Sequence, residues 1–423
     1  MVEGKTPRAF RVLVSSYACQ PGEGSEAGIG WNWVFALAKA GVSVWVLTLP
    51  KGKDAIEKVL SENPNLDLHF VYIEHPAFGR FLRNLRGGHS WNHLPAYFEW
   101  QDKAYKVAKN LFQEVDFDVV HHISMSSLHV GSRLWRLDRP FIFGPVGGGQ
   151  TAPAGFREHL RGGWLFEYIR TIVARHLYGY ILNARSTVRG SALVLVANRE
   201  TEMAVRHIGA REVRSMTDIG FATDRVSARS PVSRCKDEPL RILWIAKLNP
   251  RKGLLLALEA VSLIESDTAW KLTIIGDGPQ AHMLPRWLKR LTLEGKVEWR
   301  GRIPWANVQT AYDDADLFLF TSLRDTTGIQ LLEAMGRGVP ILTLDHQGAA
   351  TVVPFSAGIR VPVSTPKQTA EQLARAIERL AADRALLSKM GEAAIEVARS
   401  HGWDRKALEA IAIYEELTES ECP

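Results

Sequence analysis

Residues 317–340 read LFLFTSLRDTTGIQLLEAMGRGVP and contain, in order, an apolar strand, a turn with glycine at position 328, and an apolar helix. The first backbone N–H groups of a helix have no partner inside it, and together with the helix dipole they favour an anion. Asp325 in the turn and Glu333 in the helix bracket this position. We therefore expect a nucleoside diphosphate there, with both carboxylates accepting hydrogen bonds from sugar hydroxyls. The alternative is an ordinary capped helix with solvated acids.

Outward from this stretch, short Val, Ile and Leu runs alternate with helical patterns, which predicts βαβ units and parallel sheets. The first set of predicted strands comprises RVLVSSY, SVWVLTLP, DFDVVHH, RPFIFGP and ALVLVAN. The second comprises LRILWIAKL, KLTIIGDGP, KVEWRGRI, ADLFLFTS, VPILTLDH and AGIRVP. We predict two doubly wound domains, residues 1–222 and 241–399, joined by a polar linker at 223–240. In such α/β folds the ligand binds at the carboxyl ends of the strands.

Composition agrees with a large folded enzyme. The 423 residues favour two or three domains, and 46% of them are hydrophobic. No apolar run approaches the roughly 20 residues that span a bilayer, and the N-terminus lacks a signal-peptide pattern. Cys19, Cys235 and Cys422 are scattered without metal-binding spacing. We expect a reducing cytoplasm, with neither a disulfide framework nor a zinc site.

A basic loop follows the first strand of the second set. WIAKLNPRKG, residues 244–253, places Lys247, Arg251 and Lys252 where they can neutralise charge that builds on a leaving diphosphate. The alternative is a solvated loop. At the next strand end, the GDGP turn contains Gly276 and Gly278, which either border the nucleotide or only form a tight turn.

The first predicted domain has a glycine-rich loop after its first strand, GEGSEAGIGW at residues 22–31. Its glycines only partly match the G-x-G-x-x-G spacing of dinucleotide-binding proteins, which weakens a dehydrogenase reading. Gly22, Gly24, Ser25 and Glu26 of this loop are candidate binding residues because the loop resembles one that faces the donor phosphates and helps to place the acceptor in a family of sugar-transferring enzymes. The alternative is a turn with a helix cap at Ser25.

Two histidines end the strand DFDVVHH. His122, in preference to His121, is a candidate catalytic residue that donates a hydrogen bond to the sugar or steers the acceptor hydroxyl. The alternative is a buried structural histidine. The glycine loop GPVGGGQ, residues 144–150, is expected to line the same cleft.

Residues 156–189 combine six arginines with interleaved Trp, Phe and Tyr residues, against two glutamates. Such a stretch can lie on an anionic membrane surface and meet a lipid-linked acceptor. The alternative is one or two surface helices whose apolar stripe packs inward. No nucleic-acid motif accompanies the charge. Asp314 and Asp316 imitate a metal-binding pair, but they lead directly into a strand, and we expect no metal there.

Several of these motifs resemble the family 4 retaining glycosyltransferases, also called glycosyl transferases group 1. The family pattern ExFGxxxLEAM followed by GxPV appears here as DTTGIQLLEAM followed by GVP, and the family's GRLxxxKG corresponds to AKLNPRKG. The resemblance implies the GT-B fold, with two Rossmann-like domains facing a cleft. It also implies that the C-terminal helix, 400–423, packs back on the first domain.

The resemblance also implies roles for individual residues. Asp325 would meet the donor sugar, Thr327, Gly328 and Ile329 the phosphate or sugar, Glu333 the ribose, and Lys247 and Lys252 the diphosphate. Two positions depart from the family: Asp325 replaces glutamate, and Lys247 replaces arginine, whose planar fork Arg251 could supply instead.

The activity implied is retaining transfer of a sugar from a nucleoside-diphosphate sugar to a glycan, lipid-linked or small-molecule acceptor, in polysaccharide or glycoconjugate synthesis. The implied reaction needs no metal, cofactor or dedicated protein base. We expect a protein with this activity to lie in the cytoplasm or at the inner face of the membrane. The alternatives are a sugar-nucleotide epimerase or phosphorylase of the same fold, and a non-catalytic sugar-nucleotide-binding protein.

Overall fold

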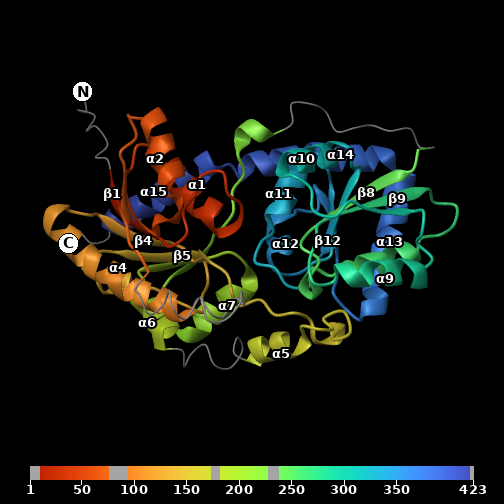
Figure 1. Ribbon diagram of the computed structural model, residues 1–423, viewed down its shortest axis with the longest axis horizontal. Coiled ribbons are helices and arrows are strands. Elements are labelled where there is room, and N and C mark those ends of the chain that lie inside the picture. The colour runs from red at the N-terminus through yellow and green to blue at the C-terminus, as the bar shows by residue number, and fades with distance from the viewer. Residues whose placement is uncertain (1–9, 76–93, 173–181, 227–237, 420–423) are drawn as a thin grey trace. The chain divides into compact units, whose positions relative to one another are not determined.

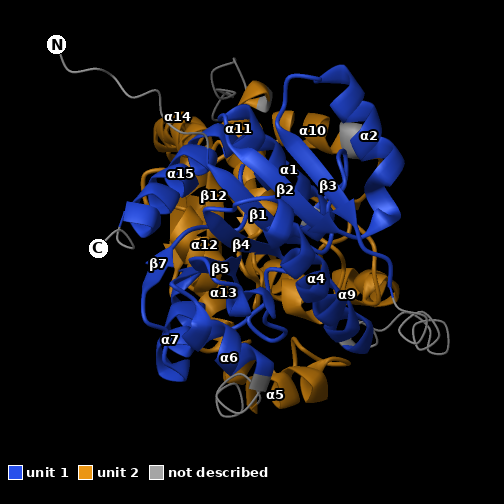
Figure 2. Cartoon of the chain, turned by 90° about the vertical axis from the view of Figure 1, so that its left-hand side faces the viewer, with its two compact units in different colours: residues 1–149, 175–220, 403–423 blue, residues 150–174, 221–402 orange. Residues whose placement is uncertain are grey.

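The structure is a computed structural model that describes residues 10–75, 94–172, 182–226 and 238–419. The chain forms two compact units, coloured separately in Figure 2. Unit 1 comprises residues 1–149, 175–220 and 403–423, and unit 2 comprises residues 150–174 and 221–402. Each unit contains one parallel sheet with helices packed on it (Figure 1), so the predicted pair of Rossmann-like domains is confirmed. Across the described residues, none of the helices combines the length and the apolar character needed to cross a bilayer.

The sheet of unit 1 has the order β3-β2-β1-β4-β5-β6-β7. Its strands are β1 (Arg11–Ser16), β2 (Ser43–Thr48), β3 (Leu68–Tyr72), β4 (Val119–Ser124), β5 (Phe141–Val146), β6 (Leu193–Val196) and β7 (Val213–Ser215). The order reverses between β1 and β4, which pair in parallel with Val12 opposite Val119. Strands β3 and β7 were not predicted from the sequence. Both are edge strands, so neither needs the continuous apolar run of a strand that is buried on two faces.

Helices cover this sheet because their apolar stripes face it. They are α1 (Ser25–Lys39), α2 (Lys53–Glu62), α4 (Leu94–Glu114), α6 (Leu182–Gly190), α7 (Arg199–Ile208) and α15 (Trp403–Glu419), with 3-10 turns η1 (Pro50–Gly52) and η3 (Leu134–Arg136). Trp33 of α1 and Tyr414 of α15 are fully buried in one core with the strand residues. Asn198 caps α7 by accepting a hydrogen bond from the Thr201 N–H, and Gly209 ends it in the left-handed conformation.

The sheet of unit 2 has the order β10-β9-β8-β11-β12-β13. Its strands are β8 (Leu240–Ile245), β9 (Trp270–Ile275), β10 (Val297–Trp299), β11 (Leu317–Phe320), β12 (Ile341–Leu344) and β13 (Gly358–Val361). All six coincide with strands of the second predicted set. The alternation of apolar runs with helical patterns therefore identified the whole sheet.

The helices of unit 2 are α5 (Trp164–Ile172), α8 (Leu254–Ser262), α9 (Leu284–Arg290), α10 (Trp305–Asp313), α11 (Ile329–Gly336), α12 (Gln347–Val352), α13 (Pro366–Ala382) and α14 (Arg384–Ser400). Short 3-10 turns are η4 (Ala154–Phe156), η7 (Thr223–Arg225), η8 (Pro250–Lys252) and η9 (Ala281–Met283). Thr365 caps α13 and Asp383 caps α14, each by accepting from a backbone N–H three residues later. Leu256 of α8 and Ile377 of α13 share the core with the strands.

The structure changes two of the predicted domain boundaries. Residues 150–174, which the sequence placed in the first domain, belong to unit 2 because Phe156 and Leu160 are fully buried in the unit 2 core. The C-terminal helix starts at Trp403 rather than at residue 400, and it belongs to unit 1. Residues 227–237 of the predicted linker lie outside the described residues.

Candidate functional site

The loops after β8 and β11 hold the predicted residues Lys252 and Asp325 of unit 2, and the loop after β12 adds Gln347, which was not predicted. Lys252 ends η8 after β8, Asp325 follows β11, and Gln347 begins α12 after β12. These three strands are neighbours in one parallel sheet, so their carboxyl ends share one edge. The fold therefore brings together residues that are far apart in the sequence.

Lys252 and Asp325 form an ion pair that is largely shielded from solvent. The Lys252 Nζ contacts Oδ2 of Asp325, which also accepts a hydrogen bond from Ser322 Oγ at 3.2 Å. Arg251 Nη1 lies 3.4 Å from the other carboxylate oxygen. Burial opposes ionisation of Asp325, but Lys252 and Arg251 outweigh it and hold the pKa of Asp325 below its usual range. Burial lowers the pKa of Lys252, against the attraction of Asp325.

The turn that leads into α11 depends on Gly328. Its φ is 98°, and a Cβ there would lie 2.9 Å from the Phe320 ring, so a larger residue would be strained and crowded. Ile329 is the first residue of α11, and Thr327 is buried beside the turn. One turn further on, Glu333 accepts a hydrogen bond from the Tyr312 hydroxyl at 3.0 Å. Burial, reinforced by Glu333, raises the pKa of Tyr312 well above its usual value.

Gln347 is a residue of this edge that the sequence analysis missed. It has a left-handed φ of 53°, which is uncommon for a residue other than glycine and is found at functional sites. Its Oε1 accepts from the Asp325 N–H at 2.9 Å, and its Nε2 donates to the Thr151 carbonyl at 2.8 Å. Its position directly after β12, in LDHQG, was the available signal.

Helix α5 approaches the Asp325 loop through its polar face. Glu167 receives two hydrogen bonds of 2.7 Å from the guanidinium of Arg324, the neighbour of Asp325. Arg170 donates to the Gln150 carbonyl at 2.6 Å, and Gln150 donates from its side chain to Thr326 at 2.8 Å. Burial, with repulsion from Arg324, lowers the pKa of Arg170 to about 10. Sequence spacing gave no sign of these contacts.

The GDGP turn has a structural reason for its glycines. Gly276 has a φ of 135°, and a Cβ there would lie 1.9 Å from the Ala246 carbonyl oxygen; a Cβ on Gly278 would lie 2.5 Å from that of Leu248. The turn therefore packs closely against the loop that carries Lys247, which is exposed. This geometry favours the turn-forming alternative for both glycines.

The predicted residues of unit 1 lie at the start of α1. Gly22 has a φ of 75°, and Gly24 rather than Ser25 is the N-cap residue. Glu26 accepts hydrogen bonds from the Ser126 N–H at 2.5 Å and from its hydroxyl at 3.1 Å. Burial raises the pKa of Glu26 above its usual value, although the Ser126 N–H opposes this. Glu26 is therefore a residue of this loop whose carboxyl pKa is shifted, as is common at functional sites.

His121 and His122 are fully buried. The His121 ring pairs with the Tyr414 hydroxyl and the Gly144 carbonyl, each at 2.7 Å. The His122 ring pairs with Ser15 Oγ and the Met125 carbonyl, each at 3.2 Å. Burial lowers the pKa of each histidine to about 4. Because both nitrogens of each ring are engaged inside the core, the structure favours the structural alternative for both histidines, and His122 is not part of the candidate site.

Two other predicted features also have structural explanations. The Asp316 carboxylate accepts a hydrogen bond from the Arg241 N–H at 2.9 Å and lies 3.8 Å from Arg384 Nη1, which ties the start of β11 to β8. Of the stretch 156–189, residues 173–181 lie outside the described residues. Ala184 and Val188 of helix α6 are buried, as the surface-helix alternative expects. Helix α5 does not follow that alternative, because its large apolar residues are exposed.

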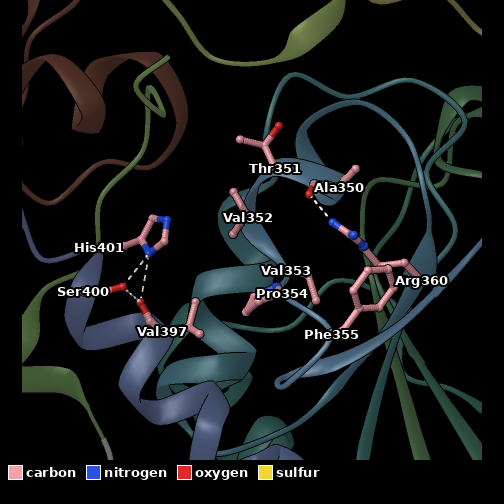
Figure 3. A pocket seen from close by; sticks show the side chains of 10 residues that line it. All are labelled: Ala350, Thr351, Val352, Val353, Pro354, Phe355, Arg360, Val397, Ser400 and His401. Atoms are coloured by element: carbon pink, nitrogen blue, oxygen red, sulfur yellow. Dashed lines mark hydrogen bonds between the residues drawn. The ribbon is translucent and has the colours of Figure 1, made fainter. Parts of the chain in front are cut away.

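A pocket of about 470 Å³ lies elsewhere in unit 2 (Figure 3). Its lining comprises Ala350, Thr351, Val352, Val353, Pro354, Phe355, Arg360, Val397, Ser400 and His401, none of which is a predicted site residue. Arg360 stacks over the Phe355 ring at 4.0 Å and donates to the Ala350 carbonyl. The main cation of this pocket is therefore already engaged within the chain.

Comparison with known proteins gives matches that agree with this architecture. Over 172 residues the chain is 33% identical to WcaL of Escherichia coli K12, which carries the provisional name of a colanic acid biosynthesis glycosyltransferase; the match covers 39% of this chain and 42% of WcaL. The amylovoran biosynthesis glycosyltransferase AmsK of Erwinia amylovora is 32% identical over 123 residues, or 27% of this chain and 30% of AmsK. The chain thus spans less than half the length of these curated relatives.

The whole chain also matches solved structures. Anabaena HepE, solved in complex with UDP and glucose, superposes with a TM-score of 0.60 at 16% identity, over 96% of this chain and all of HepE. This likeness shows that the fold is GT-B. The family model that matches is glycosyl transferases group 1, over residues 228–397. That match covers β8 to β13 and the Lys252, Asp325 and Glu333 positions of unit 2.

Proposed function

We propose that the protein is a retaining glycosyltransferase of family 4 that moves a sugar from a nucleoside-diphosphate sugar to a glycan or lipid-linked acceptor in bacterial polysaccharide or glycoconjugate synthesis. The observation that carries the proposal is the Lys252–Asp325 pair at the sheet edge just before α11, the helix that carries Glu333. The family match over 228–397 and the names of WcaL and AmsK support it.

In this proposal the diphosphate of the donor occupies the α11 N-terminus. Lys252 and the N-terminal end of α11 stabilise the negative charge that develops as the bond between the sugar and the diphosphate breaks. Arg251 lies close enough to Asp325 to add its charge. The basic residues supply the neutralisation that a bound cation would otherwise give, so the proposal requires no metal.

The reaction forms one bond and breaks one bond at the anomeric carbon. The acceptor hydroxyl oxygen attacks on the same face from which the diphosphate leaves, and the hydroxyl proton passes to the departing phosphate oxygen. The products are the lengthened acceptor and a nucleoside diphosphate. The carboxylate of Glu333 accepts hydrogen bonds from the ribose, for which its half-buried position beside Tyr312 suits it.

Asp325 acts on the sugar with limited reach. Among the residues that the structure describes, Lys252 and Ser322 contact its Oδ2, whereas Oδ1 makes the longer 3.4 Å contact with Arg251. Oδ1 can therefore accept a further hydrogen bond from a donor hydroxyl, since each carboxylate oxygen has two acceptor positions. A glutamate would extend one methylene further, so we expect Asp325→Glu to change which donor sugar is used best.

The test measures binding and turnover separately. Uridine, guanosine and adenosine diphosphate sugars are compared by thermal shift, because a ligand that binds only the folded state raises its stability in proportion to RT ln(1 + [L]/Kd). Transfer is then followed by mass spectrometry with the stabilising donor and extracted glycan and lipid-linked acceptors. We expect one donor class to stabilise the protein, and Lys252→Ala and Glu333→Gln each to lower transfer by about 100-fold or more.

Matched controls come from exposed residues of unit 2. Lys271→Ala and Glu294→Gln remove the same charges away from the cluster and should leave transfer unchanged. Full activity in both Lys252→Ala and Glu333→Gln would refute the assigned site. Isomerisation or cleavage of the donor without an acceptor would instead favour the epimerase or phosphorylase alternative, and donor binding without any turnover would favour a binding protein.

A further inference from the structure

Helix α5 has an inverted distribution of side chains. Glu167 and Arg170 are buried, with 5% and 7% of their surfaces exposed. The exposed residues are large and apolar or aromatic: Leu165 (69% exposed), Phe166 (41%), Tyr168 (51%), Ile169 (50%) and Ile172 (37%). Their spacing places them together on one face of the helix. A contiguous apolar face of this kind marks an interaction site.

The polar face of α5 is fixed to unit 2. Two hydrogen bonds join Glu167 to Arg324, and Arg170 donates to the Gln150 carbonyl. Just before the helix, Phe156 and Leu160 are part of the unit 2 core. These contacts hold the helix by its charged side, so the apolar face is presented outward from a rigid support rather than from a loose segment.

The chemistry around the apolar face fits an anionic lipid surface. Arg157 and Arg161 are exposed in the turn that precedes α5, where Glu158 is the exposed acid. The Arg157 guanidinium stacks over the Trp164 ring, 5.4 Å from its centre, and Trp164 lies 6.0 Å from the Tyr168 ring. Arginine with Trp and Tyr beside an apolar face is the composition of helices that lie in the interface of a bilayer.

A bilayer fits this face better than a protein partner does. The face consists of the five exposed apolar or aromatic residues of one short helix, so its apolar area is on the order of a few hundred Å². Stable protein interfaces bury about 800 Å² on each partner. A lipid surface needs no complementary shape, because acyl chains and headgroups adapt to the inserted side chains.

We propose that α5 is a membrane-docking helix that inserts its apolar face into an anionic phospholipid bilayer, with Arg157 and Arg161 contacting lipid phosphates. The sequence predicted a membrane contact within residues 156–189, and the exposed face of α5 is the part of that stretch that makes it. If the proposed function holds, the Glu167–Arg324 pair keeps the donor site next to the bilayer, where a lipid-linked acceptor is found.

The experiment measures vesicle binding of the full chain without donor, acceptor or turnover, so its outcome is independent of the proposed function. Co-flotation is compared for vesicles of phosphatidylcholine alone and of phosphatidylcholine with roughly one third of the anionic lipid phosphatidylglycerol. We expect wild-type protein to bind the anionic vesicles and Leu165→Ser with Ile169→Ser to lower the partition coefficient about tenfold or more. Arg157→Gln with Arg161→Gln should remove the preference for anionic lipid.

The matched control is the double variant Met203→Ser with Leu408→Ser, which removes side chains of unit 1 that are 57% and 62% exposed. It should bind vesicles as the wild type does. The proposal is overturned if wild-type protein stays with the unbound fraction, if the Leu165→Ser, Ile169→Ser variant binds as well as wild type, or if the Met203→Ser, Leu408→Ser control loses as much binding as that variant does. A wild-type dimer that becomes a monomer in the α5 variant, seen by light scattering without lipid, would assign the face to a second copy and also overturn it.

Discussion

At the scale of single residues, the pairing of Lys252 with Asp325 explains why a lysine can be buried at this sheet edge. An ammonium removed from water costs several kcal/mol unless a charge of opposite sign compensates it. Asp325 provides that charge, and Ser322 and Gln347 hold the aspartate in turn, through its carboxylate and its N–H. The shorter aspartate is thus suited to this contact, while a glutamate would place its carboxylate further from the main chain.

Removing one partner of this pair should cost more than removing both. Asp325→Asn leaves the buried Lys252 ammonium without its carboxylate, and we expect a loss of about 3 kcal/mol in the free energy of unfolding. Lys252→Met with Asp325→Asn should be more stable than the sum of the single changes by about 2 kcal/mol. Urea unfolding of the wild type, both single variants and the double variant gives this coupling, and strictly additive changes would contradict it.

The buried histidines predict an acid-sensitive unit 1. Their pKa of about 4 lies below the ordinary 6.5, so the unfolded chain binds protons that the folded chain does not. Their contribution to stability is present above pH 6.5 and is lost as the pH falls toward 4, by up to about 3 kcal/mol for each histidine. His122→Asn should reduce the fall in urea midpoint between pH 7.5 and 5. The exposed His207→Asn should not, and equal falls in all three proteins would contradict the argument.

At the scale of elements, strand ends and turns determine which residues meet. The carboxyl edge of the unit 2 sheet was predictable, because the central strands β8, β11 and β12 are largely apolar and the motif residues of β8 and β11 lie in the loops that follow them. Gln347 was missed although it follows β12, since a single polar residue in a turn has no periodicity. The inverted α5 could not be predicted: its polar side is satisfied by Arg324 and Gln150, and those partners become neighbours only after folding.

The GDGP turn provides a prediction about close packing. Gly276→Ala would place a methyl group 1.9 Å from the Ala246 carbonyl oxygen at a φ of 135°, so we expect a loss of about 3 kcal/mol or more and displacement of the Lys247 loop. Gly295→Ala is the matched control, because its φ is 84° but nothing lies within 4 Å of the added methyl. It should cost about 1 kcal/mol. Urea unfolding compares them, and similar losses would show that packing is not the cause.

At the scale of the whole molecule, the chain passes between its units more often than the sequence indicated. Residues 150–174 leave unit 1 after β5 and join unit 2, and the chain then returns for α6, β6, α7 and β7. The single polar linker at 223–240 was the visible boundary because it is rich in charged residues and proline. Residues 150–174 have no such composition. In the sequence, their apolar Phe156 and Leu160 could belong to the core of either unit.

The assignment of residues 150–174 to unit 2 can be tested by substitutions in the hydrophobic core of each unit. Phe156 is fully buried among unit 2 residues, so Phe156→Ala should remove about 3–5 kcal/mol from that core. Phe143→Ala makes the same change at a fully buried position of β5 in unit 1. Hydrogen exchange followed by mass spectrometry should show faster exchange in β8 to β13 for Phe156→Ala and in β1 to β7 for Phe143→Ala, because protection reports local stability. Faster exchange in β4 and β5 of Phe156→Ala, with β8 to β13 unchanged, would return residues 150–174 to unit 1. It would also remove the rigid support on which the outward face of α5 depends.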